Sequence, residues 1–148
     1  MEYQTKSEQE LIDLGKTLAK DFKPGDIVLL YGDLGAGKTT MTKGMAEHFG
    51  ITDVVSPTFT LMQTYPEQNF VHIDTYRLED KEQLVEIGVE DYLGNENYIC
   101  VIEWPEKIEG LLKDKPARHA SLQGVAGGKT IKIKIEHDGD GRKVEIKN

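Results

Sequence analysis

The sequence is poor in cysteine and has no long apolar segment, and both absences narrow the classes of protein it can represent. Its 148 residues contain one cysteine, Cys100, which excludes an internal disulfide and favours a reducing compartment. No apolar run approaches the ~20 residues that a membrane-spanning helix needs. The first ten residues do not have the pattern of a signal peptide. We therefore expect a soluble, cytoplasmic protein.

Basic residues are fewer than acidic ones, which argues against nucleic acid as the main ligand. Eighteen lysines and arginines stand against 26 aspartates and glutamates, a formal net charge of −8. A protein whose affinity comes from neutralising phosphates needs the opposite balance. Residues 1–112 hold 9 basic and 21 acidic side chains, and residues 113–148 hold 9 and 5. The basic C-terminal part leaves direct binding of a nucleic acid as a secondary hypothesis, which the acidic remainder disfavours.

The length indicates one domain, because domains usually hold roughly 100–200 residues. We expect residues 1–148 to form a single domain in which 113–148 contributes variable C-terminal strands. Helical spacing of apolar residues alternates with short apolar runs, an order typical of an α/β layered domain. The predicted helices cover residues 7–22, 38–48, 80–87 and 106–112, and the predicted strands cover 27–31, 58–63, 70–74, 98–102, 130–136 and 142–146.

Several of these elements carry specific sequence signals. Ser7 and Glu10 form a capping box at the start of the first helix. The runs 27–31 and 98–102 are apolar throughout, as in parallel strands that are covered on both faces. In 130–136 isoleucines alternate with charged residues, which predicts a strand with one exposed face. The turn residues 138–141 predict that this strand pairs with 142–146.

A phosphate-binding motif follows the first predicted strand. Residues 32–39 read GDLGAGKT and match the pattern G-x-x-x-x-G-K-[ST] in full. Glycines let backbone N–H groups close around an anion, and the N-terminal end of the next helix adds positive charge. In such a loop Lys38 reaches the β and γ phosphates, and Thr39 offers its hydroxyl to Mg²⁺. A similar run at 127–130 lacks the first glycine and precedes a strand, so we interpret it as a turn.

Two acidic residues come at the ends of predicted strands, where ligands of parallel α/β sheets bind. Asp74 ends one strand, and Glu103 directly follows another. Nucleotide hydrolysis needs an acid in such a position, either to hold the metal's water shell or to orient the attacking water. Either acid alone is compatible with a solvated strand end. Beside a phosphate loop, the pair indicates at least one functional acid.

Other features leave functional and structural interpretations open. Trp104, the only tryptophan, is either a packing aromatic or part of the site. Residues 56–59 are either a rigid turn or a switch segment that senses the γ phosphate. Arg77 either stabilises the negative charge of a phosphate group during its transfer or forms an ion pair at the surface. Cys100, in the middle of an apolar strand, is predicted to be structural.

Four motifs in one order give the chain a resemblance to a known family. They are GDLGAGKTT at 32–40, SPTF at 56–59, HIDTYR at 72–77 and VIEWP at 101–105. With these spacings the chain closely resembles the TsaE family, also known as YjeE or YdiB, over residues 7–112. The resemblance weakens after residue 112, where residues 113–130 form a longer and more basic segment than the family pattern has.

The resemblance implies a bacterial P-loop ATPase with a central mixed, largely parallel sheet. It also implies two partner proteins, TsaB and TsaD, and a role in making threonylcarbamoyladenosine at position 37 of tRNAs that read ANN codons. In this family TsaD performs the transfer, and TsaE-like proteins bind the TsaB–TsaD assembly and hydrolyse ATP to reset it between turnovers. The chain would then meet tRNA only indirectly, through the complex, with neither DNA nor a membrane as a partner.

Cofactors and site residues are implied by the same resemblance. ATP or ADP and Mg²⁺ are the expected cofactors, with Thr39 and Glu103 holding the metal. The expected catalytic residues are Asp74, Glu103 and Trp104. The expected nucleotide-binding residues are Gly32, Asp33, Leu34, Gly35, Ala36, Gly37, Lys38, Thr39 and Thr40.

Three other functions share the phosphate loop. A small-molecule kinase generally needs several arginines around its substrates, whereas this chain has only Arg77, Arg118 and Arg142, widely separated. A regulatory GTPase is expected to contain an [NT]-K-x-D motif, which is absent from the sequence. A nucleotide-gated binding module without turnover would differ from an ATPase only in lacking hydrolysis when its partners are present.

Overall fold

The central element of the structure, a computed structural model that describes residues 1–57, 60–80, 82–93, 95–109 and 128–148, is a seven-stranded mixed sheet. Its strand order is β1-β7-β6-β2-β5-β4-β3. The strands are β1 (Glu2–Thr5), β2 (Ile27–Tyr31), β3 (Met62–Tyr65), β4 (Phe70–Asp74), β5 (Ile99–Glu103), β6 (Thr130–Asp138) and β7 (Gly141–Lys147).

The middle of the sheet is parallel and its edges are antiparallel. Strands β6, β2, β5 and β4 pair in parallel, whereas β1, β7 and β3 join by antiparallel pairing. This arrangement confirms the predicted α/β fold with a mixed sheet and a parallel centre. Strand β1 was not expected, because its four residues are mostly polar and it pairs with β7 alone.

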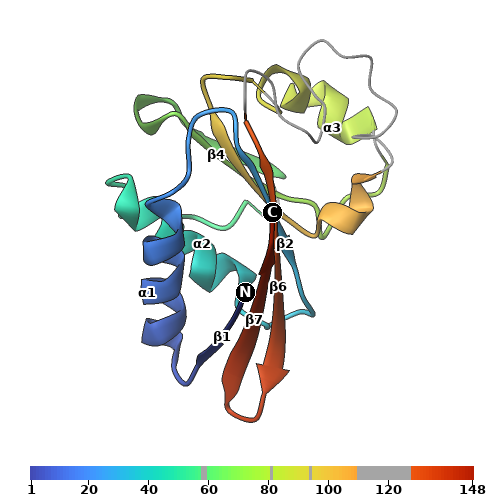
Figure 1. Cartoon of the computed structure of the whole chain (residues 1–148). Helices are drawn as coiled ribbons and strands as arrows, with labels where there is room; N and C mark the ends of the chain where they lie inside the picture. Colours follow the sequence, from blue (N-terminus) through green and yellow to red (C-terminus); the bar gives the residue numbers. More distant parts are fainter. Residues whose placement is uncertain (58–59, 81, 94, 110–127) are drawn as a thin grey trace.

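Helices cover both faces of this sheet. Helices α1 (Glu8–Ala19) and α2 (Lys38–His48) lie on one face, and the short α3 (Glu82–Glu86) lies on the other (Figure 1). Three 3₁₀ turns, Pro66–Gln68, Val89–Asp91 and Pro105–Lys107, join other elements. The Ser7 cap of α1 is confirmed, because Ser7 Oγ accepts a hydrogen bond from the Glu10 backbone N–H. The reciprocal bond of a capping box is shifted by one residue, since the Glu10 carboxylate accepts from the Lys6 N–H instead of the Ser7 N–H. No helix among the described residues combines the length and apolarity needed to cross a bilayer.

Some elements begin or end at other residues in the structure than the sequence predicts. The strand expected at 58–63 is observed as Met62–Tyr65, and residues 58–59 lie outside the described part. The helix expected at 80–87 is shortened to Glu82–Glu86, although Asp80 caps it as expected. The helix expected at 106–112 does not begin at residue 106, where the chain forms the 3₁₀ turn Pro105–Lys107. Glu109 is helical, and residues 110–112 lie outside the described part.

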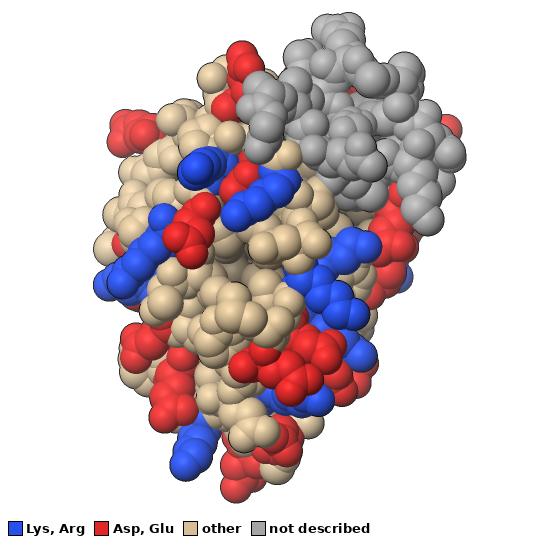
Figure 2. Space-filling model, viewed as in Figure 1, with Lys and Arg blue, Asp and Glu red and all other residues tan. Residues whose placement is uncertain are grey.

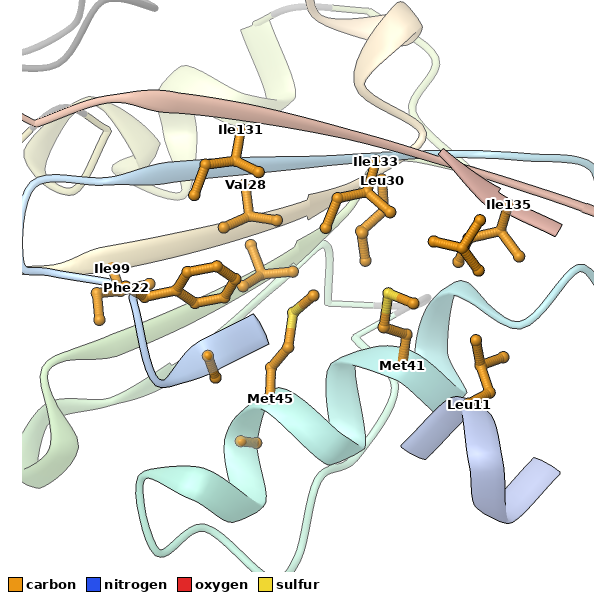
Figure 3. Close-up of a cluster of buried hydrophobic side chains, with 14 of the residues drawn as sticks. Leu11, Phe22, Val28, Leu30, Met41, Met45, Ile99, Ile131, Ile133 and Ile135 are labelled. Carbon is orange, nitrogen blue, oxygen red and sulfur yellow. The ribbon is translucent and has the colours of Figure 1, made fainter. Parts of the chain in front are cut away.

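The larger part of the core lies between the sheet and the α1/α2 pair. Met41 and Met45 of α2 point toward the sheet, where they face Val28 and Leu30 of β2 (Figure 3). The alternation predicted for 130–136 is confirmed, since the isoleucines of β6 are buried in this cluster and the charged residues between them are exposed. Each such buried side chain contributes roughly 1.5–3 kcal/mol relative to an exposed one.

Helices α1 and α2 approach each other closely because glycines stand at their crossing. A Cβ at Gly44 of α2 would overlap the backbone carbonyl of Ile12, and a Cβ at Gly15 of α1 would overlap that of Met41. Backbone atoms of a packed helix cannot move aside cheaply. The contact between the helices therefore depends on the absence of these two side chains.

We expect Gly44→Ala to destabilise the protein by about 1–3 kcal/mol, the usual cost of overpacking. At an unobstructed helical position the same change would stabilise it by about 0.8–1.0 kcal/mol. Urea unfolding measures the difference, with the exposed Lys43→Ala on the same helix as the control. An unchanged or raised midpoint for Gly44→Ala would show that the helices do not pack this closely.

Candidate functional site

The glycine-rich loop lies at the carboxyl end of β2, between that strand and α2. Gly37, the residue that precedes α2, has a φ of 115°, which a side chain rarely tolerates. A Cβ there would also overlap the Leu11 side chain of α1. As the N-cap residue of α2, Gly37 has no side chain that could occupy the N–H groups of the first turn. The loop and this helix end therefore present backbone N–H groups that suit an anion.

Lys38, the first residue of α2, turns back over the loop. Its side chain is only 4% exposed, and its Nζ donates to the backbone carbonyls of Gly32 and Asp33. The same Nζ lies 3.9 Å from the centroid of the Trp104 ring. Burial lowers the pKa of Lys38, while the carboxylate of Glu103 acts in the opposite direction. The ammonium is thus held at the loop by carbonyls and an aromatic face.

Glu103 ends β5 directly beside the loop. It is 2% exposed, and Thr39 Oγ1 lies 2.8 and 3.1 Å from its two carboxylate oxygens. On the neighbouring strand, His72 Nε2 lies 2.5 Å from Glu103 Oε2. Asp74 is paired in register with Glu103 across β4 and β5. The two predicted acids therefore lie side by side at the carboxyl ends of β4 and β5.

Trp104 follows Glu103 in a left-handed conformation, with a φ of 60°. Its ring packs against Tyr76 at a centroid distance of 5.0 Å, and its carbonyl accepts a hydrogen bond from Thr75 Oγ1. A non-glycine residue in this conformation is uncommon and often marks a functional position. Here it turns the indole over Lys38. Trp104 is thus part of the site's wall.

These residues surround one pocket of about 540 Å³. Its walls include all three predicted catalytic residues, Asp74, Glu103 and Trp104, together with Lys38, Thr39 and Thr40 of the motif. Ser56 and Arg77 also line it. Trp104, Arg77 and the first residue of segment 56–59, which the sequence left open to a functional or a structural interpretation, therefore all face the site. Of the predicted switch segment, residues 58–59 lie outside the described part.

Two oxygen-bearing side chains at the loop are the candidates for holding a metal ion. Among the described residues, no group of three or more His, Cys, Asp and Glu side chains could hold a metal ion. Mg²⁺ usually binds through one or two protein oxygens and the phosphates of a substrate. Thr39 and Glu103 place hard oxygen atoms next to each other at the loop. This donor set fits Mg²⁺ delivered with a nucleotide.

Cys100 is buried in β5, as predicted for a structural residue. Its Sγ lies 3.2 Å from the Tyr92 carbonyl. Burial raises the pKa of the thiol to about 12. Burial of this kind agrees with the structural role that the sequence predicts.

Two residues at the site were missed by sequence reasoning. His72 could have been found, since it precedes Asp74 by two residues in a strand and so shares its face. Arg142, on β7, donates from Nε to the Ala36 carbonyl (2.7 Å) and from Nη2 to the Gly35 carbonyl (3.3 Å). No local pattern signals this contact, because it joins residues 106 positions apart.

Comparison with known proteins agrees with the resemblance that the sequence motifs indicate. The family model described as "Threonylcarbamoyl adenosine biosynthesis protein TsaE" matches residues 5–144. The chain belongs to the TsaE family. A protein named tRNA threonylcarbamoyladenosine biosynthesis protein TsaE from Rickettsia felis is 49% identical over 110 residues, which are 72% of this chain and 63% of that protein. The protein of the same name from Bacillus subtilis is 41% identical over 112 residues, 74% and 69% of the two chains.

A solved structure shares the fold of this TsaE family member. The crystal structure of Bacillus subtilis YdiB is similar with a TM-score of 0.72 at 33% sequence identity. The similarity covers 97% of this chain and 82% of that one.

Trp104 offers a direct optical test of the site, because it is the only tryptophan. An ammonium over an indole quenches its fluorescence by donating a proton to the excited ring. We expect Lys38→Met to raise the native emission intensity and to leave the emission in urea unchanged. Lys43→Met, an exposed position on the same helix, serves as the control. Equal native spectra for Lys38→Met and the unaltered protein would contradict the Lys38–Trp104 contact.

Proposed function

We propose that this protein is a Mg²⁺-dependent ATPase subunit of tRNA threonylcarbamoyladenosine synthesis that acts on the TsaB–TsaD complex. The observation that carries the proposal is the meeting of Lys38, Thr39 and Glu103 at the phosphate loop, in one pocket with Asp74. We further propose that residues 1–148 act as one ATPase domain.

Each residue has a role that follows from its position. The loop N–H groups bind the phosphates, and Lys38 exchanges its carbonyl partners for phosphate oxygens. Thr39 and Glu103 would hold Mg²⁺, which neutralises charge on the phosphates when it is bound. Asp74, at the adjacent strand end, orients the attacking water. Trp104 covers Lys38 and closes that side of the pocket against solvent.

A second pocket, of about 370 Å³, supports a nucleoside triphosphate as the ligand. It shares Gly35, Gly37 and Thr40 with the phosphate pocket and is also lined by Leu11 and Arg142. Phosphates on one side of the loop and a nucleoside on the other would fill both pockets. The absence of an [NT]-K-x-D motif from the sequence favours adenine over guanine.

The surface supports indirect contact with tRNA. On the face seen in Figure 2, basic and acidic side chains are intermingled rather than separated. On the C-terminal hairpin, Lys134 Nζ lies 3.2 Å from Glu136 Oε1, and Lys143 Nζ lies 3.4 Å from Oε1 of Glu2 in β1. These pairs reduce the net positive field that RNA binding requires. We therefore propose that tRNA is reached through TsaB and TsaD, in the cytoplasm.

The central experiment measures nucleotide binding and hydrolysis. We expect weak ATPase activity alone and a higher rate with TsaB and TsaD. Lys38→Ala should weaken ATP binding by about 10–100-fold, since charged hydrogen bonds contribute about 1.5–3 kcal/mol, with little loss of stability. Glu103→Gln should retain binding and lose hydrolysis. Absence of nucleotide binding with Mg²⁺ present would refute the proposal, and ADP release that depends on an added small acceptor would indicate a kinase.

Arg142 gives a further test, because it holds two carbonyls of the loop from outside. Arg142→Ala should raise the Kd for ADP by roughly tenfold, since losing charged hydrogen bonds frees the loop backbone. Lys143→Ala is the matched control, because this neighbouring side chain is turned to the other face of β7 and pairs with Glu2. Calorimetric titration of the two variants measures the effect. Equal affinities would show that Arg142 does not order the loop.

A further inference from the structure

His72 is a buried polar residue to which the proposed function gives no role. It lies in β4 between two fully buried residues, and its own side chain is 0% exposed. One ring nitrogen, Nε2, lies 2.5 Å from Glu103 Oε2. The other, Nδ1, is buried and has no hydrogen-bonding partner among the described residues. Burying a polar ring costs free energy unless its polar atoms are hydrogen-bonded.

The chemistry of the contact assigns the hydrogen atom. A carboxylate only accepts hydrogen bonds, so Nε2 must be the donor. In the neutral tautomer with hydrogen on Nε2, the buried Nδ1 carries a lone pair rather than an unsatisfied N–H. Thr39 Oγ1 donates to the same carboxylate, with its shorter contact, 2.8 Å, to Oε1. Glu103 is therefore held from two sides, by α2 and by β4.

These contacts leave the carboxylate little rotational freedom. If Nε2 were absent, the Thr39 hydroxyl would be the one side-chain donor left to the Glu103 carboxylate among the described residues, and that hydroxyl is the group proposed to meet Mg²⁺. Residues that orient metal-binding carboxylates from behind change metal affinity or activity by about 10–100-fold when they are removed. A leucine at position 72 would fill the space without supplying the donor.

We propose that His72 is a positioning residue that, through its Nε2–H, orients the Glu103 carboxylate toward the Mg²⁺ site at the phosphate loop. The inference rests on the proposed function for the identity of the metal site. It assigns His72 no contact with nucleotide or metal. Its effect therefore lies in how much Mg²⁺ the site requires, and not in how the loop binds phosphate.

The test compares His72→Leu with His72→Gln. A glutamine amide reaches the position of Nε2 and restores the donor, whereas leucine does not. ADP binding is measured in EDTA and over a range of Mg²⁺ concentrations, and bound Mn²⁺ is followed by electron paramagnetic resonance as a readout independent of turnover. In His72→Leu we expect unchanged affinity in EDTA and a Mg²⁺ requirement raised by about 10–100-fold. His72→Gln should stay close to the unaltered protein.

Two further variants separate positioning from packing. Thr42→Val removes another buried hydrogen-bonding side chain, one that contacts the Lys38 carbonyl rather than Glu103, and should leave the Mg²⁺ requirement unchanged. In a Glu103→Gln background, His72→Leu should have no further effect on the Mg²⁺ requirement, because the group it orients is already altered. Equal loss in His72→Leu and His72→Gln, or no loss in a folded His72→Leu, would overturn the proposal.

A measurement on the unaltered chain covers the case in which His72→Leu fails to fold. Nitrogen-15 spectra of labelled imidazoles identify the tautomer of each histidine, and the signal that disappears in His72→Gln is that of His72. Hydrogen on Nε2 is expected, and hydrogen on Nδ1 alone would overturn the proposal. Failure of the proposed function would look different, because the unaltered protein would then bind no nucleotide in any of these conditions.

Discussion

Parallel pairing of β2, β5 and β4 is the constraint on which the site depends. It brings the end of β2, where the phosphate loop begins, beside the ends of β5 and β4. Glu103 and Asp74 are paired in register, so neither acid can move along its strand independently. A slip of one residue would turn Glu103 to the face that Ile102 now occupies. Because that face is packed with buried apolar side chains, the slip would also bury the Glu103 carboxylate without hydrogen-bonding partners.

The second constraint is the burial of charged side chains at the phosphate loop and at the carboxyl ends of β4 and β5. Lys38, Asp74 and Glu103 are each less than 5% exposed. Charges in such places are costly unless hydrogen bonds compensate them. Carbonyl oxygens and an aromatic ring face Lys38, and a hydroxyl and an imidazole face Glu103. Groups held in this way need little rearrangement to act on a charged ligand, which is the physical basis of electrostatic preorganisation.

The phosphate loop is also fixed from outside by segments distant in sequence. Leu11 of α1 lies against Gly37, and a Cβ at Gly32 would overlap the carbonyl of Ile135 in β6. Arg142 of β7 binds two loop carbonyls. The N-terminal helix and the C-terminal hairpin therefore both shape a loop that a nine-residue motif encodes. The close α1/α2 crossing at Gly15 and Gly44 keeps α2, and with it Lys38 and Thr39, at a set distance from these supports.

Most of the fold was predictable where local signals are strong. Helix α2 and strands β2 and β4 have the bounds that the pattern predicts, and β6 continues to Asp138 instead of ending at residue 136. Local signals failed at β1, whose polar residues form a strand only because β7 offers an edge. They also failed at β3, which begins four residues late after Leu61 adopts a positive φ.

The sequence by itself determined the phosphate loop, the strand–loop–helix unit around it and the two acids, because these depend on glycine geometry, apolar runs and spacing along one segment. Only the tertiary structure decided which side chains hold those groups in place. Lys38 meets Trp104, His72 meets Glu103 and Arg142 meets the loop through contacts that span 31 to 106 residues. Such contacts arise from strand order and helix packing, which are properties of the whole folded chain. The residue pattern within a single segment therefore does not predict them.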